Sequence, residues 1–404
     1  MTSVVSVEEA QKIIFSAVSP GPTVRLPLRS AVNRTLAEAV VCDIDFPPFD
    51  RALMDGYAVR AADMASVPAT LKVVGQVPAG EVPQAELAPG EAMQISTGAP
   101  IPAGCDAVVR VEDSELHGEK VTIRAAVSAG QYIARRAEYT RAGQTVLEAG
   151  ARLSAGRIAI AAVAGASVVE VYEQPTVAIL VTGDELVEVD RVPSGPRIRD
   201  SNRYLLDALV RECHCRPVDL GVARDDRSSL TARIKEGLST GFLCMTGGVS
   251  MGEYDSVPEC LQACGATIRF HKLALRPGKP ALFATTEQGA YVFALPGNPV
   301  SAFATFRLLV LPALARRQGR PAAPPRTVRA RLTGVLSGAP DGQSCHPARV
   351  EPDDRGQLLA EPLSWRASGD PFGLARANAL AVLPPGSPAR RAGDEVQVLL
   401  LEVP

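Results

Sequence analysis

The sequence predicts a multi-domain α/β protein, in which a mostly parallel α/β domain follows an N-terminal helical and β region and precedes a C-terminal β-domain. Between residues 175 and 320, short apolar runs alternate with segments of helical spacing, which is typical of a parallel sheet with helices on both faces. On either side of this part, short β-type runs are separated by Pro and Gly. The length of 404 residues fits roughly two to four domains.

The N-terminal region is predicted to begin with a helix from Ser6 to Val18, because Ser6 and Glu9 have the spacing of a capping box. A second helix is expected from Ser154 to Ala164. Between them, β-type runs at residues 71–74, 92–95, 107–111 and 120–123 indicate an inserted β-domain. We therefore predict a discontinuous N-terminal domain, 1–50 and 133–174, around an inserted domain, 51–132.

The α/β domain is predicted over residues 175–320. Its strands are expected near residues 177–182, 217–220, 242–246, 267–275, 281–285 and 291–295, and its helices near 202–212, 228–238 and 256–264. A long helix should follow the last strand, with Asn298 as its cap and Pro299 in its first turn. Ligands of such sheets bind beyond the C-terminal ends of the strands.

The C-terminal part is predicted to be a separate β-domain over residues 321–404. The run from Arg316 to Pro325, rich in Arg, Pro and Ala, is typical of a linker. Beyond it, strands are expected at residues 327–335, 358–363, 380–383 and 395–401.

Composition excludes several classes of protein. The formal net charge is −2 and no basic run occurs, which argues against nucleic acid as a partner. No apolar stretch reaches the length of about 18 residues that a membrane span needs, and no signal-peptide pattern is present. Eight cysteines without a disulfide framework fit a reducing compartment, so a cytoplasmic location is expected. The Cys213-His214-Cys215 run has no partner pair at zinc-ligand spacing, so we discount a zinc site.

Glycine and polar residues follow three of the predicted strands directly. The segment from Thr246 to Asp255 reads TGGVSMGEYD, and its two adjacent glycines let backbone N–H groups converge on an anion the size of phosphate. The other two strands lead into Gly183-Asp184-Glu185 and Pro296-Gly297-Asn298. We expect the three strand ends to share one anion-binding crevice.

Charged residues near these strand ends could hold a metal ion and a second anion. Four carboxylates could meet at this edge of the sheet and hold Mg²⁺ with substrate phosphates: Glu185, Asp225, Asp226 and Asp255. Taken singly, each is more often a helix cap or a solvated charge. Arg276 and Lys279, on a rigid RPGKP loop, would neutralise an oxyanion or a phosphate. No GxxxxGK[ST] pattern is present, so we discount an ordinary nucleoside triphosphatase.

Seven motifs together resemble the molybdopterin molybdenumtransferase family, which includes the MoeA proteins and the gephyrin E-domain. They stand in the family's order over most of the chain: DRALMDGYAVR (50–60), STGAP (96–100), TGDEL (182–186), DSN (200–202), TGGVSMGEYD (246–255), RPGKP (276–280) and LPGNPVS (295–301). Each motif alone is weak, and the Asp55 and Thr97 motifs would fit simple turns equally well. The ordered set is specific.

The resemblance implies an elongated homodimer of four-part subunits whose α/β domain binds the pterin. It also implies the reaction, in which molybdate is inserted into the dithiolene of adenylylated molybdopterin. The adenylate would be cleaved in a step that depends on Mg²⁺ or a similar metal, giving molybdenum cofactor and AMP. Further partners implied are the adenylylating enzyme of the pathway and the molybdoenzymes that accept the cofactor.

Carried over residue by residue, the resemblance also implies the site. Asp55 and Thr97 would lie on a rim supplied by the β-domain side and face the partner subunit. Glu185 and Asp255 would be the metal-associated carboxylates, and these four residues with Lys279 would be catalytic. Substrate binding would fall to Arg135, Arg136, Thr182, Gly183, Asp225, Asp226, Thr246, Gly247, Gly248, Ser250, Arg276, Pro296, Gly297, Asn298, Arg349 and Ser368. The sequence leaves open which of the adjacent residues 225 and 226 acts.

The chain departs from the family pattern at three places. Arg276 stands where the family usually has Lys, which keeps the charge but changes the geometry. Ala137 and Tyr139 replace a Gly and an Asp, so the role of that Asp is not carried over. Residues 342–349 also differ from the family's usual Gly-Arg-rich, Phe-containing stretch.

Two other functions are kept as alternatives. The change at Tyr139 suggests a catalytically weak paralogue that binds or carries pterin or cofactor, or acts as a scaffold. The α/β domain also occurs in competence-damage-like amidohydrolases that act on nucleotides. Those proteins lack the Asp55 and Thr97 motifs, which makes this alternative the weaker one.

Overall fold

The computed structural model describes residues 4–249, 256–364 and 369–401, which pack as two compact units. The first unit comprises Met1–Val24, Asn33–Ala37 and Glu170–Pro404, and the second comprises Arg25–Val32 and Glu38–Val169. The chain passes between the units at four points, of which the first lies in strand β1 (Thr23–Pro27) and the last in strand β12 (Val168–Tyr172). The four predicted domains divide the chain more finely, and their boundaries stay a prediction.

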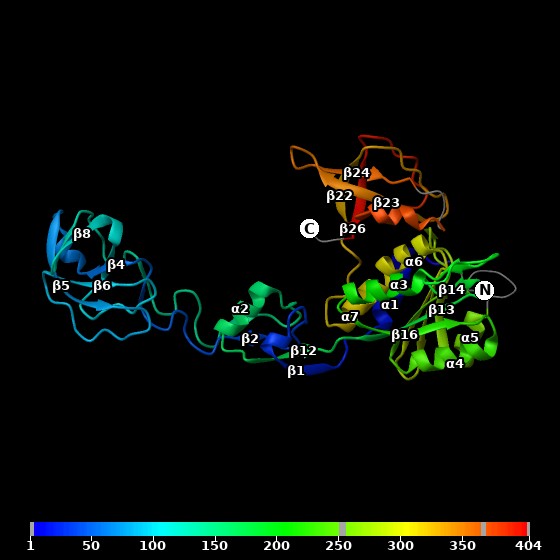
Figure 1. Ribbon diagram of the computed structural model, residues 1–404, viewed down its shortest axis with the longest axis horizontal. Coiled ribbons are helices and arrows are strands. Elements are labelled where there is room, and N and C mark those ends of the chain that lie inside the picture. Colours follow the sequence, from blue (N-terminus) through cyan, green and yellow to red (C-terminus); the bar gives the residue numbers. More distant parts are fainter. Residues whose placement is uncertain (1–3, 250–255, 365–368, 402–404) are drawn as a thin grey trace. The chain divides into compact units, whose positions relative to one another are not determined.

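A six-stranded sheet forms the centre of the first unit (Figure 1). Its order is β16-β13-β17-β21-β20-β18, and it is mostly parallel, since only β20 runs against its neighbours. The strands are β13 (Thr176–Thr182), β16 (Arg216–Ala223), β17 (Phe242–Thr246), β18 (Ala266–His271), β20 (Leu282–Thr286) and β21 (Tyr291–Leu295). The predicted parallel α/β domain is confirmed.

Helices cover both faces of this sheet because its strands are apolar on both sides. Along β13, Ile179 belongs to one buried cluster and its neighbour Leu180 to the other. The first face packs against α1 (Val7–Ala17), α3 (Asn202–Glu212) and the helix α6 (Pro299–Thr305), η4 (Phe306–Val310) and α7 (Leu311–Arg317). The second face packs against α4 (Arg227–Leu238) and α5 (Val257–Ala263) (Figure 1). At the start of α1, the Ser6 hydroxyl accepts a hydrogen bond from Glu9 N at 3.0 Å, which confirms the predicted cap.

The long helix from Pro299 to Arg317 lies in the core of the first unit. By length and composition it could cross a membrane, but 72% of its apolar stretch is buried inside the fold. Asn298 and Pro299 open it as predicted, although the Asn298 side chain makes no capping hydrogen bond. Pro312 has no N–H to donate to the carbonyl of Leu308, four residues earlier. The buried Gln11 side chain of α1 donates to that carbonyl at 2.9 Å, and so ties α1 to the helix.

The C-terminal strands form a closed ring. The strands are β22 (Val328–Leu332), β23 (Gln343–Pro352), β24 (Leu358–Pro362), β25 (Ala379–Leu383) and β26 (Glu395–Leu400), and the short helix η5 (Pro371–Arg376) lies between β24 and β25. Pairing of β23 with both β24 and β25 closes the barrel β23-β24-β22-β26-β25. The sequence did not predict β23, so this closure was missed.

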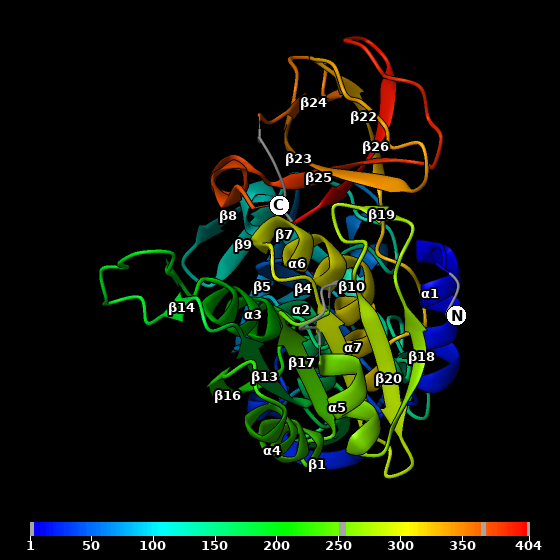
Figure 2. The ribbon, with the colours of Figure 1, turned by 90° about the vertical axis from the view of Figure 1, so that its right-hand side faces the viewer.

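A short strand joins this barrel to the α/β sheet. β19 (Leu275–Arg276) pairs in parallel with the start of β23. The strand predicted near residues 267–275 is therefore wrong in extent. β18 ends at His271, and Lys272 has a φ of +96°, which breaks the extended backbone before β19 begins. A further parallel pair, β14 (Leu186–Val187) with β15 (Ile198–Arg199), lies beside α3 (Figure 2).

The second unit is built around a six-stranded sheet in the order β7-β4-β6-β5-β9-β8. Its strands are β4 (Gly56–Val59), β5 (Ala69–Val77), β6 (Glu91–Ile95), β7 (Ala107–Arg110), β8 (Ser114–His117) and β9 (Lys120–Ile123). The unit also contains α2 (Ala155–Val163), the pairs β2 (Val40–Val41) with β11 (Thr145–Leu147) and β3 (Arg51–Ala52) with β10 (Ile133–Ala134), and the 3-10 turns η1 (Leu28–Ser30), η2 (Ala61–Met64) and η3 (Val111–Asp113). β4 was not predicted, because its four residues stand within the polar motif around Asp55.

Candidate active site

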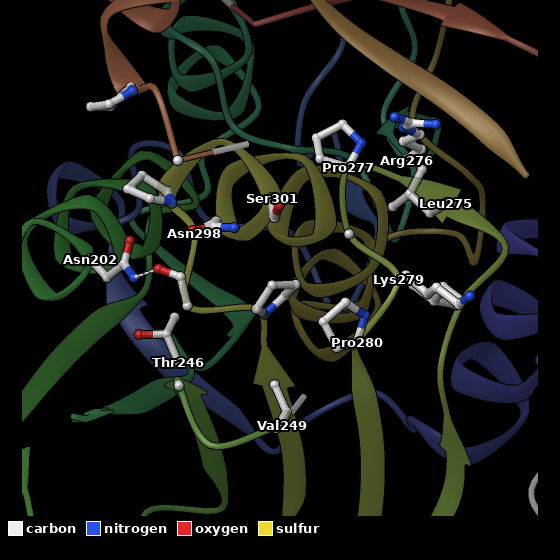
Figure 3. A pocket seen from close by; sticks show the side chains of 18 of the residues that line it. Asn202, Thr246, Val249, Leu275, Arg276, Pro277, Lys279, Pro280, Asn298 and Ser301 are labelled. Carbon is white, nitrogen blue, oxygen red and sulfur yellow. Dashed lines mark hydrogen bonds between the residues drawn. The ribbon is translucent and has the colours of Figure 1, made fainter. Parts of the chain in front are cut away.

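A cleft of about 1650 Å³ lies in the first unit, where the parallel strands end (Figure 3). Thr182, Thr246 and Pro296 stand at or just after the ends of β13, β17 and β21, and all three line it. Residues of the C-terminal part line it as well: Ser337, Gly338, Ala339, Asp341, Gly342, Ser344, His346, Gly369, Pro371 and Phe372. The three strand ends therefore share one crevice, as predicted from the sheet topology.

At the end of β13, a carboxylate fastens two loops together. Asp225 Oδ1 accepts a hydrogen bond from the Thr182 hydroxyl at 2.5 Å, and Asp225 Oδ2 accepts one from Asp184 N at 3.2 Å. Asp225 and Glu185 both line the cleft. Gly183 has a φ of +153°, a backbone conformation that L side chains rarely adopt, so the turn favours glycine.

The structure distinguishes the two adjacent aspartates that the sequence left open. Asp226 is the N-cap of α4 and accepts hydrogen bonds from Ser229 N at 2.8 Å and from the Ser228 hydroxyl at 2.7 Å. These bonds, the one from Ser229 N above all, lower the pKa of Asp226. Asp225 is the member of the pair that lines the cleft.

The two glycines after β17 let the chain turn tightly at the floor of the cleft. Gly247 has a φ of +94°, and a Cβ there would lie 2.3 Å from the carbonyl oxygen of Thr182. Gly248 has a φ of +61° and is similarly crowded by Val257. The next predicted residues, Ser250 and Asp255, lie outside the described residues, so the metal role of Asp255 stays a prediction. Within the described ranges, no cluster of three or more His, Cys, Asp or Glu side chains could hold a metal ion.

The C-terminal barrel holds the loop that carries the two cations. Arg276 pairs with Ser344 across β19 and β23, and Gln343 N donates to Ala274 O at 2.8 Å. Gly342 packs so closely that a Cβ there would lie 2.6 Å from the carbonyl carbon of Ala274. Arg276 and Lys279 are exposed and line the cleft (Figure 3). The loop that carries Arg276 and Lys279 is thus fixed both by the α/β part of the first unit and by the C-terminal barrel.

Sequence reasoning gave Asn202 no role, although it lies in a quoted motif. Its Nδ2 donates to Gly297 O at 2.6 Å, which fastens α3 to the turn before α6 (Figure 3). Two buried polar atoms in this wall, Asn202 Oδ1 and Thr246 Oγ1, have no hydrogen-bond partner within the described part of the chain. A buried polar atom left unpaired costs about 1–3 kcal/mol, so such atoms indicate a ligand or water position.

A buried ion pair stabilises the same wall of the cleft, next to Asn202. Asp200, which is 1% exposed, lies with its Oδ2 3.2 Å from Arg203 Nε. Arg203 also contacts Glu188 and Asp219, and its side chain is only 13% exposed. Burial raises the pKa of Asp200, while Arg203 opposes that change. This network fixes the start of α3 and therefore the position of Asn202.

The C-terminal part contributes residues to the cleft that sequence reasoning missed. They are Ser337, Asp341, Ser344, His346 and Phe372. Burial lowers the pKa of His346, and the charge of Arg276 lowers it further. These residues were missed because β23 was not predicted. A strand there would have placed Ser344 and His346, which are two residues apart, on one face.

Four predicted residues lie in the second unit, where they bind one another or nearby acids. Asp55 Oδ1 accepts a hydrogen bond from Thr97 N at 2.8 Å. Arg135 pairs with Asp50 at 2.6 Å. Arg136 pairs similarly with Asp45, at 2.7 Å. Their part in the reaction stays a prediction.

Two further predicted residues are in the C-terminal part. Arg349 Nε donates to Glu351 at 2.9 Å, and Arg349 is not among the residues that line the cleft. Ser368 lies outside the described residues. Substrate binding by these two stays a prediction.

Comparison with known proteins places the whole chain in one family. Three family models match consecutive parts: MoeA N-terminal region (domain I and II) at residues 5–165, probable molybdopterin binding domain at 178–316, and MoeA C-terminal region (domain IV) at 329–401. The chain is 35% identical to a molybdopterin molybdenumtransferase of Nostoc sp., over 100% of this chain and 95% of that protein. The enzyme of the same name from Staphylococcus aureus is 33% identical, over 98% and 96%.

Solved structures agree with the sequence relatives. Two structures of the molybdopterin biosynthesis MoeA protein from Pyrococcus horikoshii are 32% and 31% identical to this chain, with TM-scores of 0.81 and 0.84. They cover 99% and 98% of this chain, and 100% of each of those chains is covered. The chain therefore belongs to the molybdopterin molybdenumtransferase family.

Proposed function

We propose that this protein is a transferase of molybdenum cofactor biosynthesis, which inserts molybdate into adenylylated molybdopterin and releases AMP. The observation that carries the proposal is the cleft, in which glycine-rich strand ends and two cations converge. The relatives named molybdopterin molybdenumtransferase match over nearly the full length. That full-length likeness does not favour the alternative of a weak paralogue or scaffold.

The proposed substrate carries a dianionic oxyanion and a phosphate linkage, and the cleft offers different groups for each. Arg276 can donate two parallel hydrogen bonds to an oxyanion, whereas Lys279 acts as a compact charge. Backbone N–H groups at Gly247 and Gly248 suit a phosphate, because glycine lets the anion approach the backbone closely. The fixed loops hold these donors in place before the substrate arrives, which favours catalysis by electrostatic stabilisation.

A divalent metal is part of the proposal, since the oxygen donors of the cleft fit Mg²⁺. Glu185 and Asp225 are exposed carboxylates that line it, and hard cations prefer such ligands together with substrate phosphates. Glu185 with Asp255 would hold the ion, and Asp225 would orient the loop beside it through Thr182 and Asp184. When bound, the metal would neutralise the phosphate charge.

A homodimer is also proposed, because the second unit exposes many large apolar side chains. Those that are 38–53% exposed include Val41, Ile44, Phe49, Leu53, Met54, Tyr139, Ile160, Val163 and Val168. Tyr139, Ile160 and Val163 line one hollow of this unit, and exposed patches of apolar side chains are typical of protein interfaces. Sedimentation equilibrium of the full chain should give twice the mass of 42.4 kDa; a monomer at all concentrations would contradict the dimer.

A cytoplasmic location belongs to the same proposal. All eight cysteines are free thiols, which is expected in a reducing compartment.

The reaction can be tested by measuring AMP release. The full chain, given adenylylated molybdopterin, molybdate and Mg²⁺, should release AMP, and Lys279→Ala and Asp255→Asn should reduce the rate sharply. Lys235→Ala, on the exposed part of α4, is the matched control and should retain the rate. Unchanged turnover in both site variants would contradict the site. Tight pterin binding without metal-stimulated AMP release would instead support the non-catalytic alternative.

A further inference from the structure

We propose that Phe372 binds the substrate by stacking its side chain on a flat, nitrogen-containing ring. The inference rests on the proposed function, because adenylylated molybdopterin carries two such rings, the purine of the adenylate and the pterin. It assigns a ring of the substrate to an uncharged residue outside the anion-binding loops. No covalent bond forms or breaks in this contact.

Phe372 is unusually exposed for an aromatic residue. It is 81% exposed, whereas the other exposed aromatic residues in the described part of the chain, Phe49, Tyr139 and Tyr204, are 42–53% exposed. Within the described residues its ring makes no contact with another aromatic ring or with a cationic side chain. A single exposed apolar side chain is ordinary on a protein surface, so the position of the ring decides its role.

That position is in the wall of the cleft. Among the described residues that line the cleft, Phe372 is the only Phe, Tyr or Trp. Two other exposed, large apolar residues line it, Val4 and Ile198, but their branched side chains have no flat face. The anion-binding loops therefore share their cleft with one exposed phenyl ring.

The short helix η5 fixes the backbone on both sides of this ring. Asp370 is the N-cap of η5, and its Oδ1 accepts a hydrogen bond from Phe372 N at 3.1 Å. Gly373 is buried, and Leu374 packs against the core cluster on the first face of the sheet. Phe372 is thus anchored through its neighbours while its own side chain stays exposed. An aromatic side chain with two rotatable bonds on a fixed backbone loses little entropy when a ligand stacks on it.

The helix η5 also lies close to the strand ends that form the anion site. It packs against α6, and a Cβ on Gly369 would lie 3.4 Å from Asn298 Oδ1, so the two segments touch at the start of α6. Figure 2 shows η5, the orange-red helix beneath the barrel, on the side of α3, whereas β19 with Arg276 lies on the other side. A ligand whose anionic group is held by Arg276 and Lys279 would extend across the cleft towards Phe372.

Stacking is the contact that a phenyl ring can make with this substrate. Purine and pterin rings are planar, and their π-faces pack against aromatic side chains in offset stacks. Stacking of this kind tolerates different rings, because each has a π-face. The shared chemistry is therefore a flat heteroaromatic ring, and experiment has to distinguish the purine from the pterin.

The test is the KM for adenylylated molybdopterin in the AMP-release assay, measured on the full chain. We expect Phe372→Ala to raise this KM by about 5- to 150-fold, the range that follows from loss of one stacked ring, with little change in kcat. Phe372→Leu should behave similarly, because it keeps apolar volume but has no flat face. Phe372→Tyr keeps the ring and should retain the wild-type KM. Val335→Ala is the control, since Val335 is an exposed residue of the C-terminal part that is not among those lining the cleft.

Inhibition constants identify which ring stacks. AMP carries the purine, and neopterin carries a pterin ring without the adenylate. If the purine stacks on Phe372, the inhibition constant of AMP should rise in Phe372→Ala and that of neopterin should not. If the pterin stacks there, the reverse is expected. Ribose 5-phosphate, which lacks the purine, should inhibit the wild type and Phe372→Ala equally.

An unchanged KM in Phe372→Ala and Phe372→Leu would overturn the inference and leave the proposed function intact. A loss in Phe372→Tyr as large as that in Phe372→Ala would overturn it as well, because the ring would then not be the group that matters. The exposed side chain contributes little to folding, so urea unfolding of the variants should match the wild type. If Phe372→Ala does not fold, Phe372→Leu and Phe372→Tyr decide. If the wild type releases no AMP, the proposed function itself fails, and the inference with it.

Discussion

The cleft of the first unit and the Asp55–Thr97 turn of the second unit differ in how their polar groups are used. In the turn and its surroundings, Asp55 accepts from Thr97 N, and Arg135 and Arg136 are paired with nearby acids. Within the described residues of the cleft, neither Arg276 nor Lys279 takes part in an ion pair, and buried oxygens of Asn202 and Thr246 have no hydrogen-bond partner there. The cleft is therefore organised to receive a ligand, whereas the polar groups of the turn are satisfied within their own unit.

The largest effect is expected from the cations of the cleft. Lys279→Ala should lower kcat/KM for AMP release by about 10²–10³, because it removes a fixed charge at the oxyanion position. Arg136→Ala should have a much smaller effect, since its guanidinium is already paired with Asp45 and a surface ion pair contributes about 0–1 kcal/mol. Steady-state kinetics of both variants would check this, and equal losses would remove the contrast between the two regions.

Two glycines, one in each region, should differ in their effect on the free energy of unfolding. Gly247 and Gly98 both have positive φ, but a Cβ on Gly247 would lie 2.3 Å from a carbonyl oxygen, whereas one on Gly98 would meet open space. Gly98→Ala should cost about 1–2 kcal/mol of the free energy of unfolding, the conformational penalty alone. Gly247→Ala should cost more and weaken substrate binding. Urea unfolding would measure the free energy of unfolding of both variants. Equal losses would contradict the expectation, because they would mean that the backbone moves to make room for a Cβ at Gly247.

A smaller effect is expected where α3 is fastened to the turn before α6. Asn202→Ala removes the hydrogen bond to Gly297 O and should cost about 1–3 kcal/mol of the free energy of unfolding. Binding of the substrate should weaken as well, because the turn at Asn298 loses its support. Urea unfolding with substrate titration would test this. Full stability with normal binding would mean that the contact does not position the cleft.

The smallest effect is expected at Asp226. Its lowered pKa means that its contribution to stability is present above the ordinary value of 3.8 and is lost as the pH falls through the lower value of the folded state. Asp226→Asn keeps a good cap, so it should change neutral-pH stability and AMP release little and reduce the acid sensitivity. Asp225→Asn should slow AMP release. Unfolding curves from pH 7 to 3 and the AMP-release assay would test this. Equal loss of AMP release in the two variants would contradict different roles for Asp225 and Asp226.

Local patterns predicted the parts of the fold that local chemistry decides. The capping box at Ser6 and the glycines after β17 could be predicted because they depend on neighbouring residues. The shared crevice followed from the general topology of parallel sheets. β23 could not be predicted in the same way, since Pro347 interrupts its pattern and its place is fixed by pairing with β19, β24 and β25.

The missed parts of the candidate site have the same cause. His346 reaches the cleft only because the barrel closes beside β19. Asp225 and Asp226 are adjacent residues of the same type. Only the position at which α4 begins makes Asp226 its cap and leaves Asp225 in the loop beside Thr182. Asn202 acts on a residue 95 positions away. Contacts of that kind are set by tertiary packing, which a single sequence does not display.

We expect the cation loop of the cleft, which carries Arg276 and Lys279, to bind the oxyanion. Crystals of the full chain soaked in molybdate would test it most directly, because the anomalous scattering of molybdenum locates the metal independently of the rest of the map. We expect one strong peak within hydrogen-bonding reach of the Arg276 and Lys279 side chains. Strong peaks elsewhere, with none beside these two residues, would contradict it.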